Sequence, residues 1–588
     1  MKKIIILLMF LLIMPFVYAK EYHIPLLAVR ETTSGFEGST ADLYLEIQKG
    51  KGRIFLDTYP LTKLDTQMST RFAKEIACSE IDFDCSNYDF IYTIKSDSVI
   101  VGGPSAGAAI TLLTIAALEN LELNENITIT GTINSGGLIG PVGGLKEKID
   151  AASEIGIITI LIPHGERTAE IENITIADYV INISIENKSI IDLIKYGKSK
   201  GVNVLEVSTI DEVLYYITGR EIKKLNQTLE IDKEYMETMK SVTNGLCSKA
   251  LNFQKELSIN EFEDSDQKIF ENAVNLTKRY KKAVENEKYY SAASYCFGAN
   301  TKFAYLTLKQ EDLTNSEILT KITEIKSHIA NMNKVIDEKK LKTITDLETY
   351  MIVKERIIEA EENIDKVLDV ENTTEKIYYL SYGMERLNSA ISWSVFFDKG
   401  QKEFVINEED IKKSCMDKIY EAEERYNYLN TFSLNNFEDT QKEINLAKND
   451  LENGDYELCL FKASKAKANS DLILNTIGVE ESQLLDVTNQ KLDIIKNNII
   501  EGQREGVFPV IGYSYYEYAN DLKERDIFSS MLFVEYSLEL SNLDIYFKEK
   551  SKKIDFNIDF DNNVVSFVLI FISGLLIGIW IGKKKPKK

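Results

Sequence analysis

Ser105 and Lys148 are the residues of this sequence whose types could together perform nucleophilic chemistry. Ser105 is the one hydroxyl-bearing residue in VGGPSAGAAI (101–110), between an apolar run and a helical pattern. A serine hydroxyl becomes a strong nucleophile when a base takes its proton, and a lysine amine can be that base if burial keeps it neutral. Such chemistry requires a lysine on an apolar face.

The stretch GGLKEKIDAASEIG (143–156) supplies such a lysine if it is helical. At 100° per residue, Lys148 falls on the same arc as Leu145 and Ile149, whereas Lys146 falls on the opposite, polar side with Asp150. The spacing therefore predicts that Lys148, and not Lys146, is the buried amine.

Two other interpretations of Ser105 compete with a Ser-Lys pair. Residues 103–107 fit the G-x-S-x-G pattern of α/β-hydrolases, which need a histidine base. Of the three histidines, only His164 follows the serine within the same half of the chain. Alternatively, Ser105 ends a strand and caps the next helix, a position that serine favours. A lysine on an apolar face in the same domain favours the Ser-Lys pair over both.

The sequence around Ser105 and Lys148 contains longer stretches that resemble a known family. GGPSAG, followed by TGTINSGGLIGPVGGLKEKIDAASEIGIITILIP, resembles the proteolytic domain of Lon-type proteases, the Ser-Lys dyad peptidases. The resemblance covers roughly residues 20–220 and implies Ser105 as nucleophile, Lys148 as base and Thr130 as the hydroxyl that orients the lysine. Gly102 stands where many of these domains have an acidic residue. The sequence contains no G-x-x-x-x-G-K-[ST] loop, so the resemblance implies the peptidase without its ATPase.

The segment that must position these residues alternates short β-like runs with helical patterns. We interpret ADLYLEIQ, GRIFLDT, FIYTI, ITITGTI and TILIP as strands, and AAITLLTIAALENL and LKEKIDAASEIG as helices. The sequence thus predicts an α+β domain over residues 20–220, with KGKG (49–52) as the turn of a β-hairpin.

The following segment, residues 221–550, has a different composition. It contains no proline before Pro509, and its apolar residues recur at three- and four-residue spacing. Aromatic-led segments with small residues recur from Tyr289, Tyr378, Tyr456 and Phe528. We expect an all-α domain of stacked helical hairpins, with a single irregular bundle as the alternative.

Both ends of the chain carry targeting signals. Residues 1–19 have a basic start, an apolar run and a terminal Ala19, which predicts a cleaved secretory signal peptide, with an uncleaved anchor as the alternative. An uncharged run over residues 564–582 precedes KKKPKK, which predicts a transmembrane helix with a cytoplasmic tail. The sequence therefore predicts a single-pass cell-membrane protein whose N-terminal ectodomain lies outside.

Charge and cysteine content fit that location. The chain has 92 acidic against 69 basic residues and a formal net charge of −23, which argues against nucleic acid as a partner. Six cysteines form no CxxC metal motif and fall into local pairs, with disulfides and reduced buried thiols as alternatives. The pairs are Cys78/Cys85, Cys247/Cys296 and Cys415/Cys459.

The sequence as a whole predicts a membrane-anchored, ATP-independent serine endopeptidase that acts on unfolded or flexible protein segments. It would need no cofactor or metal, and its helical domain would contact a protein partner. The alternative is a catalytically silent Lon-like scaffold whose helical domain binds other proteins. The expected organisation is a signal peptide (1–19), a proteolytic domain (20–220), a helical domain (221–550), a juxtamembrane segment (551–563), a transmembrane helix (564–582) and a basic tail (583–588).

Overall fold

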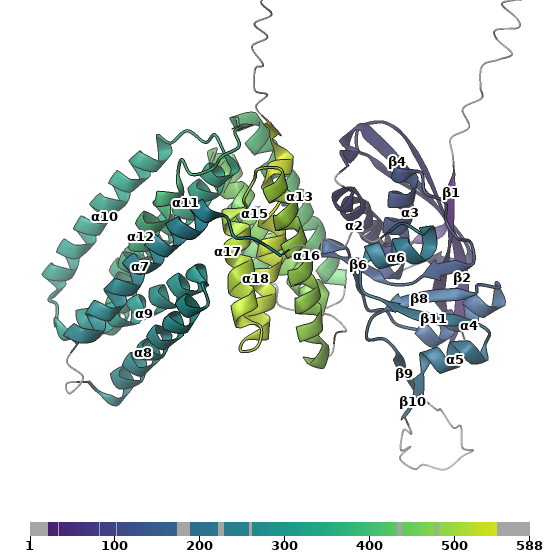
Figure 1. The fold of residues 1–588 in the computed structure, drawn as a ribbon, viewed down its shortest axis with the longest axis horizontal. Helices are drawn as coiled ribbons and strands as arrows, with labels where there is room; N and C mark the ends of the chain where they lie inside the picture. The colour runs from purple at the N-terminus through teal and green to yellow at the C-terminus, as the bar shows by residue number, and fades with distance from the viewer. Residues whose placement is uncertain are drawn as a thin grey trace, which may run out of the picture. The chain divides into compact units, whose positions relative to one another are not determined.

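The protein was analysed as a computed structural model, which describes residues 21–549 with gaps at 33–34, 82, 102, 173–187, 222–227, 258–261, 432–437, 477–478 and 480. The described residues up to Lys548 form one compact unit, in which an α+β region precedes a helical region (Figure 1). The predicted signal peptide and transmembrane helix lie outside the described residues. Within the described part of the chain, every helix is too short or too polar to cross a bilayer.

The α+β region begins with a four-stranded mixed sheet in the order β1-β2-β4-β3. β1 pairs antiparallel with β2, β2 pairs antiparallel with β4, and β3 runs parallel to β4. Alternating apolar residues of these strands pack against helix α3, so the sheet covers one side of that helix. The strands are β1 (Tyr22–Thr32), β2 (Gly35–Lys49), β3 (Ile54–Thr62) and β4 (Tyr88–Val101), and α3 is Gly107–Glu119.

The predicted hairpin at KGKG is wrong, because β4 lies between β2 and β3 in the sheet. The amides of this turn bind the start of β4 instead of closing a hairpin. Gly50 N donates to Asn87 O at 2.9 Å, and Lys51 N donates to the Asp89 carboxylate at 2.8 Å. A later strand thus takes the position that a hairpin partner would have had.

The second sheet of the α+β region is parallel, in the order β11-β8-β5. Helices α2 and α3 pack against each other, and α4 packs against β1, β2 and β8. The elements are α2 (Leu64–Glu80), β5 (Ile127–Ile129), β6 (Thr132–Asn134), β7 (Leu138–Gly140), α4 (Leu145–Glu154), β8 (Thr159–Pro163), β9 (Thr168–Glu172), β10 (Lys188–Asp192), α5 (Leu193–Ser199), β11 (Asn203–Val207) and α6 (Ile210–Thr218). The predicted α+β class is confirmed for this region.

The helical region extends from α7 to α18 and includes two short strands, β12 (Phe404–Val405) and β13 (Lys548–Glu549). Its core is one large apolar cluster that includes residues from nearly every helix. The helices are α7 (Lys233–Glu256), α8 (Asp264–Glu285), α9 (Tyr289–Gln310), α10 (Asn315–Asp337), α11 (Ile344–Asp369), α12 (Thr373–Trp393), α13 (Glu408–Thr431), α14 (Glu438–Asn453), α15 (Tyr456–Thr476), α16 (Leu484–Arg504), α17 (Val510–Leu522) and α18 (Ile527–Leu540).

The recurring aromatic-led segments lie on α9, α12, α15 and α18, each the third helix in a group of three. In every group this third helix packs against both preceding helices, so the recurring element contains three helices and not the two of a hairpin. The leading aromatic is not always part of the core: Tyr289 is buried, whereas Tyr378 and Phe528 are exposed. Small residues on the inner faces, such as Ala292 and Ala390, allow the close packing.

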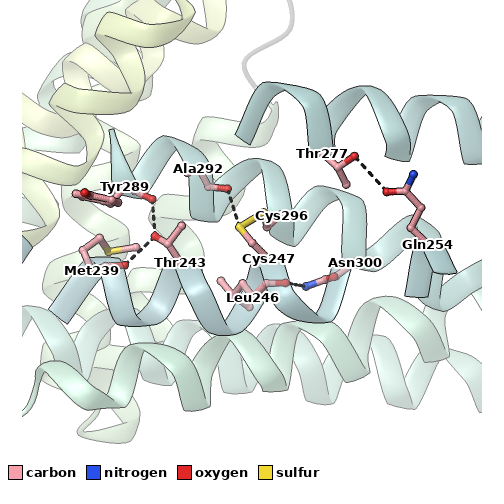
Figure 2. The surroundings of a disulfide bond; sticks show 10 residues. All are labelled: Met239, Thr243, Leu246, Cys247, Gln254, Thr277, Tyr289, Ala292, Cys296 and Asn300. Atoms are coloured by element: carbon pink, nitrogen blue, oxygen red, sulfur yellow. Dashed lines mark hydrogen bonds between the residues drawn. A yellow bond between two sulfur atoms is a disulfide. The ribbon is translucent and has the colours of Figure 1, made fainter. Parts of the chain in front are cut away.

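All six cysteines are paired as their local spacing suggested, in Cys78–Cys85, Cys247–Cys296 and Cys415–Cys459. Figure 2 shows the second disulfide, which joins α7 to α9. Hydrogen bonds flank it on the same pair of helices: Thr243 Oγ1 donates to Tyr289 O at 2.8 Å, and Asn300 Nδ2 donates to Leu246 O at 3.0 Å. Disulfides that close loops of this size typically stabilise a fold by about 2–4 kcal/mol each.

Candidate active site

Ser105 lies on a single helical turn, Pro104–Ala106, between the end of β4 and the start of α3. Gly103 precedes this turn with φ 104°, a conformation that glycine adopts at low cost. Ser69 Oγ of α2 donates to Pro104 O at 3.4 Å and so holds the turn from outside. The helix α3 is capped by Ala106 without any side-chain hydrogen bond, so Ser105 does not act as the capping residue.

The Ser105 turn is joined to the chain segment that carries Thr130. Gly131 N donates to Ser105 O at 3.0 Å, and Ala108 N donates to Gly131 O at 3.1 Å. A Cβ at position 131 would lie 2.5 Å from Ile139 Cγ2 of β7, so the close approach of β7 favours glycine here. This two-way backbone pairing fixes Thr130 beside the serine turn.

Helix α4 carries Lys148 and begins after Gly144, whose φ of 69° turns the chain into the helix. Strand β2 approaches α4 closely at Gly38, where a Cβ would lie 2.1 Å from Glu147 O and 2.9 Å from Ala151 Cβ. Leu145 and Ile149 on the inner face of α4 are buried in an apolar cluster with Leu27 of β1. The apolar arc of this helix therefore faces the sheet, as the spacing predicted.

Lys148 is buried on that face, with 3% of its surface exposed. Its Nζ donates to Thr130 Oγ1 at 3.1 Å, and Thr130 is itself 1% exposed. Burial, which removes water from the ammonium form, lowers the pKa of Lys148 from 10.5 to about 8. A lysine with this pKa carries a useful fraction of neutral amine near neutral pH.

Lys146, two residues earlier, has the opposite environment. It lies on the outer side of α4, where its Nζ is 3.3 Å from Asp150 Oδ2 and 3.8 Å from Glu147 Oε1. Partial burial lowers the pKa of Lys146, but the hydrogen bond and charge of Asp150 outweigh it, and the pKa is raised above 10.5. The burial predicted for the two lysines is confirmed.

The structure brings Ser105, Thr130 and Lys148 into one connected arrangement, through the backbone of Gly131 and the Thr130 hydroxyl. Among the described residues, the Ser105 hydroxyl makes no hydrogen bond, and Lys148 Nζ bonds Thr130 instead of the serine. The alternative base, His164, is exposed in the loop after β8. Gly102 lies outside the described residues.

Two features of the site were missed from the sequence. The first is Ser69, which contacts the serine turn from a helix far upstream and belongs to no recognisable motif. The second is the close approach at Gly38, whose only signal is one glycine in an otherwise ordinary strand pattern. Both depend on contacts between distant segments, which local spacing does not reveal.

The fold and the geometry together define a class of protein domain. A serine on a glycine-rich turn, linked through Gly131 and Thr130 to a buried lysine, is suited to acyl transfer with an amine as the base. These features fit the class of serine peptidase domains, within the α+β region.

Comparison with known proteins shows what this region is similar to. Residues 76–216 match the Lon protease (S16) C-terminal proteolytic domain. The chain is 35% identical over 122 residues to a Lon protease of Elusimicrobium minutum, which covers 20% of this chain and 14% of that protein. It is 29% identical over 157 residues to a Lon protease of Mycoplasma mobile, a match that covers 26% of this chain and 16% of that protein. A Lon protease of Geobacter metallireducens is 35% identical over 123 residues, with 20% and 15% covered.

The family match lies within the α+β region, and the chain spans less than one fifth of the length of these relatives. The matched part is similar to the proteolytic domain of Lon proteases, and this similarity supports a serine peptidase.

Proposed function

We propose that this protein is an endopeptidase that cleaves unfolded or flexible protein segments through Ser105 and Lys148, without ATP. The observation that carries the proposal is that Lys148 is buried without a charged partner that would stabilise its ammonium form. No neighbouring charge contributes to its lowered pKa, which follows from desolvation alone. A solvated structural lysine would have no reason to lose its proton near neutral pH.

In the proposed reaction, neutral Lys148 takes the Ser105 proton as Oγ attacks the scissile carbonyl. The resulting Lys148 ammonium then donates a proton to the leaving amine, and a water activated by the same lysine hydrolyses the acyl-enzyme ester. Thr130 holds Nζ in place throughout. Backbone N–H groups at the start of the helical turn after Gly103, including that of Ser105, stabilise the oxyanion.

The resting hydrogen bond from Lys148 to Thr130 is compatible with this mechanism. Proton transfer requires Lys148 Nζ within about 3 Å of Ser105 Oγ, and such contacts often tighten only when substrate is bound. Thr130 lies next to Gly131, whose N–H bonds the Ser105 carbonyl, so the residue that holds the amine is joined directly to the serine turn.

The test is hydrolysis by the full chain, purified in a mild detergent, of a fluorescently labelled protein that is permanently unfolded by reduction and alkylation. We expect release of labelled peptides at the same rate before and after ATP is removed with apyrase, since the sequence carries no phosphate-binding loop. The same substrate in its folded, disulfide-bonded form should be cleaved much more slowly. Absence of cleavage of the unfolded form would refute the proposed function.

We also propose that the protein lies outside the cytoplasm, anchored by a transmembrane helix at residues 564–582. The proposal is supported by the two terminal sequence signals and by three disulfides, because disulfides persist mainly in oxidising compartments.

A thiol measurement on native membranes tests this location. Alkylation under denaturing conditions without reduction should label none of the six cysteines, and mass spectrometry should find three crosslinked peptide pairs. A second alkylation after reduction provides the control for accessibility. Six free thiols in the first step would exclude an oxidising location.

A catalytically silent scaffold whose helical region binds other proteins is the second candidate function. It is favoured by the size of the helical region, which extends from α7 to α18 and contains a cavity of about 730 Å³ lined by both acidic and basic side chains, including Glu230, Lys399 and Arg504. Under this alternative the full chain would bind the unfolded substrate of the assay above without cleaving it.

A further inference from the structure

Ser135, five residues after Thr130, belongs to a buried polar cluster whose other members come from the helical region. Its hydroxyl donates to Glu535 Oε2 at 2.7 Å and accepts from Lys491 Nζ at 2.9 Å. Lys491 also forms an ion pair with Glu535, and Asn475 Nδ2 donates to Glu535 Oε1 at 2.8 Å. Ser135 is 5% exposed, and the other three are at most 2% exposed.

The segment Ser135–Gly137 joins β6 to β7 and is held from two sides. A Cβ at Gly136 would lie 3.4 Å from Ile494 and 3.6 Å from Leu538, both in the helical region. A Cβ at Gly137 would lie 2.7 Å from Glu80 Oε1, in the α+β region. The helical region therefore fixes the end of β6, and β6 begins two residues after Thr130.

Helix α2 is the second element of the α+β region that the helical region contacts. Arg425 Nη2 donates to Glu75 Oε2 at 3.0 Å, and Lys467 Nζ donates to Glu75 Oε1 at 2.8 Å. The Arg425 guanidinium also lies over the Phe72 ring. Ser69 lies one turn before Phe72 on α2, and its hydroxyl donates to Pro104 O of the serine turn.

These two sets of contacts from the helical region, the Ser135 cluster and the contacts with α2, are called the two grips, and they lead to different halves of the site. One runs from Lys491 and Glu535 through Ser135 to the strand that follows Thr130, the partner of Lys148. The other runs from Arg425 through α2 and Ser69 to the turn that carries Ser105. The described contacts from the helical region thus reach both segments whose separation sets the Ser105–Lys148 geometry.

We propose that the helical region is a built-in clamp for the active site, and that Lys491, Glu535 and Arg425 are positioning residues for Ser105 and Lys148. This inference rests on the proposed peptidase function for its kinetic consequence. Buried charged clusters are weak evidence of stability, but they specify one arrangement, because a shifted interface would leave the charges unpaired. A displacement of about 1 Å between reacting groups can cost about 100-fold in rate.

The test is Lys491→Met in the full chain, which leaves the size of the side chain similar but removes the charge that holds Ser135 and Glu535. We expect kcat on the unfolded protein substrate to fall about 100-fold with KM changed less than threefold, because the substrate itself does not contact this cluster. Amide hydrogen exchange should become faster in peptides that cover residues 103–107 and 130–137. The double variant Lys491→Met/Glu535→Gln, which leaves no unpaired buried charge, should keep the slow exchange of the helical core while kcat stays low.

Lys249→Met is the matched control. Lys249 Nζ pairs with buried Glu385 at 2.6 Å within the helical region, between α7 and α12, which contribute nothing to either grip. This variant also removes the lysine partner of a fully buried glutamate, although Lys249 itself is 34% exposed and Lys491 is 1% exposed. We expect its kcat and the exchange at both site segments to match the wild type.

The clamp is refuted if Lys491→Met and the double variant keep wild-type exchange at both site segments, whatever their activity. It is also refuted if Lys249→Met lowers kcat as much as Lys491→Met does, since the effect would then be general destabilisation. A wild-type chain without peptidase activity would refute the proposed function separately, and the exchange measurement would still decide whether the helical region orders the two segments.

Discussion

Ser105→Ala is expected to lower hydrolysis of an unfolded protein by at least about a thousandfold while leaving the fold intact. Removal of the nucleophile eliminates the acyl-enzyme route, and only weak residual catalysis from binding and the oxyanion donors remains. The side chain makes no hydrogen bond among the described residues, so its loss should shift the thermal midpoint by no more than a few degrees.

Initial rates of peptide release and a thermal melt of the same preparation measure the two effects together. Ser69→Ala is a useful companion, because it removes the contact at Pro104 O but keeps the nucleophile. We expect a partial loss of activity from that variant. Full activity of Ser105→Ala would end the Ser-Lys proposal.

The activity of the wild type should rise with pH through an ionisation near 8, the lowered pKa of buried Lys148. At pH 7 roughly one lysine in ten would then be neutral, against about one in 3,000 for an unperturbed lysine. Lys148→Arg should be inactive at every pH tested, because a guanidinium keeps its proton in this range. Rates from pH 6 to pH 10 on an uncharged peptide substrate provide the profile.

The burial of Lys148 should also make the free energy of unfolding depend on pH. The folded pKa of Lys148 lies below its unfolded value of 10.5, so the unfolded chain binds more protons between pH 8 and 10.5 and the free energy of unfolding rises with pH across that window. Below pH 8 the buried ammonium costs about 3 kcal/mol. Lys148→Met should therefore be inactive and yet melt a few degrees higher at pH 7.

Lys146→Ala is the control on the same helix, and it should remain largely active because Lys146 pairs with surface acids. A tolerant position 148 beside an intolerant position 146 would show that the two lysines have been assigned the wrong way round.

The arrangement around Lys148 could be predicted from the sequence because its causes are local. Helical spacing placed Lys148 with Leu145 and Ile149, and the Lon-like motif identified Thr130 as the partner of the lysine. The run ITITGTI, interpreted as one strand, is divided at Thr130 into β5 and β6. Both arguments use residues separated by one or two turns or by one element. The close spacing of the cysteines predicted their pairing for the same reason, since two of the three disulfides join helices that pack together within one group of three.

The rest of the fold depends on which distant segments meet. The turn at KGKG looks like a hairpin because nothing near it reveals that β4 will lie between its two strands. The exposed positions of Tyr378 and Phe528 follow from the packing of three-helix groups, which an aromatic-led pattern cannot specify. The contacts of Ser135 with Lys491 and Glu535 join residues about 350–400 positions apart, and no spacing rule reaches that far.

The disulfides of the helical region also determine how this protein can itself be degraded. Cys247–Cys296 and Cys415–Cys459 each close a covalent loop, 49 and 44 residues long in sequence. A processive protease that pulls its substrate through a narrow pore as a single extended strand would meet a doubled chain at each of these loops. Until the disulfides are reduced, the helical region can be cut at exposed connections but cannot be threaded, so its turnover depends on the redox state of its surroundings.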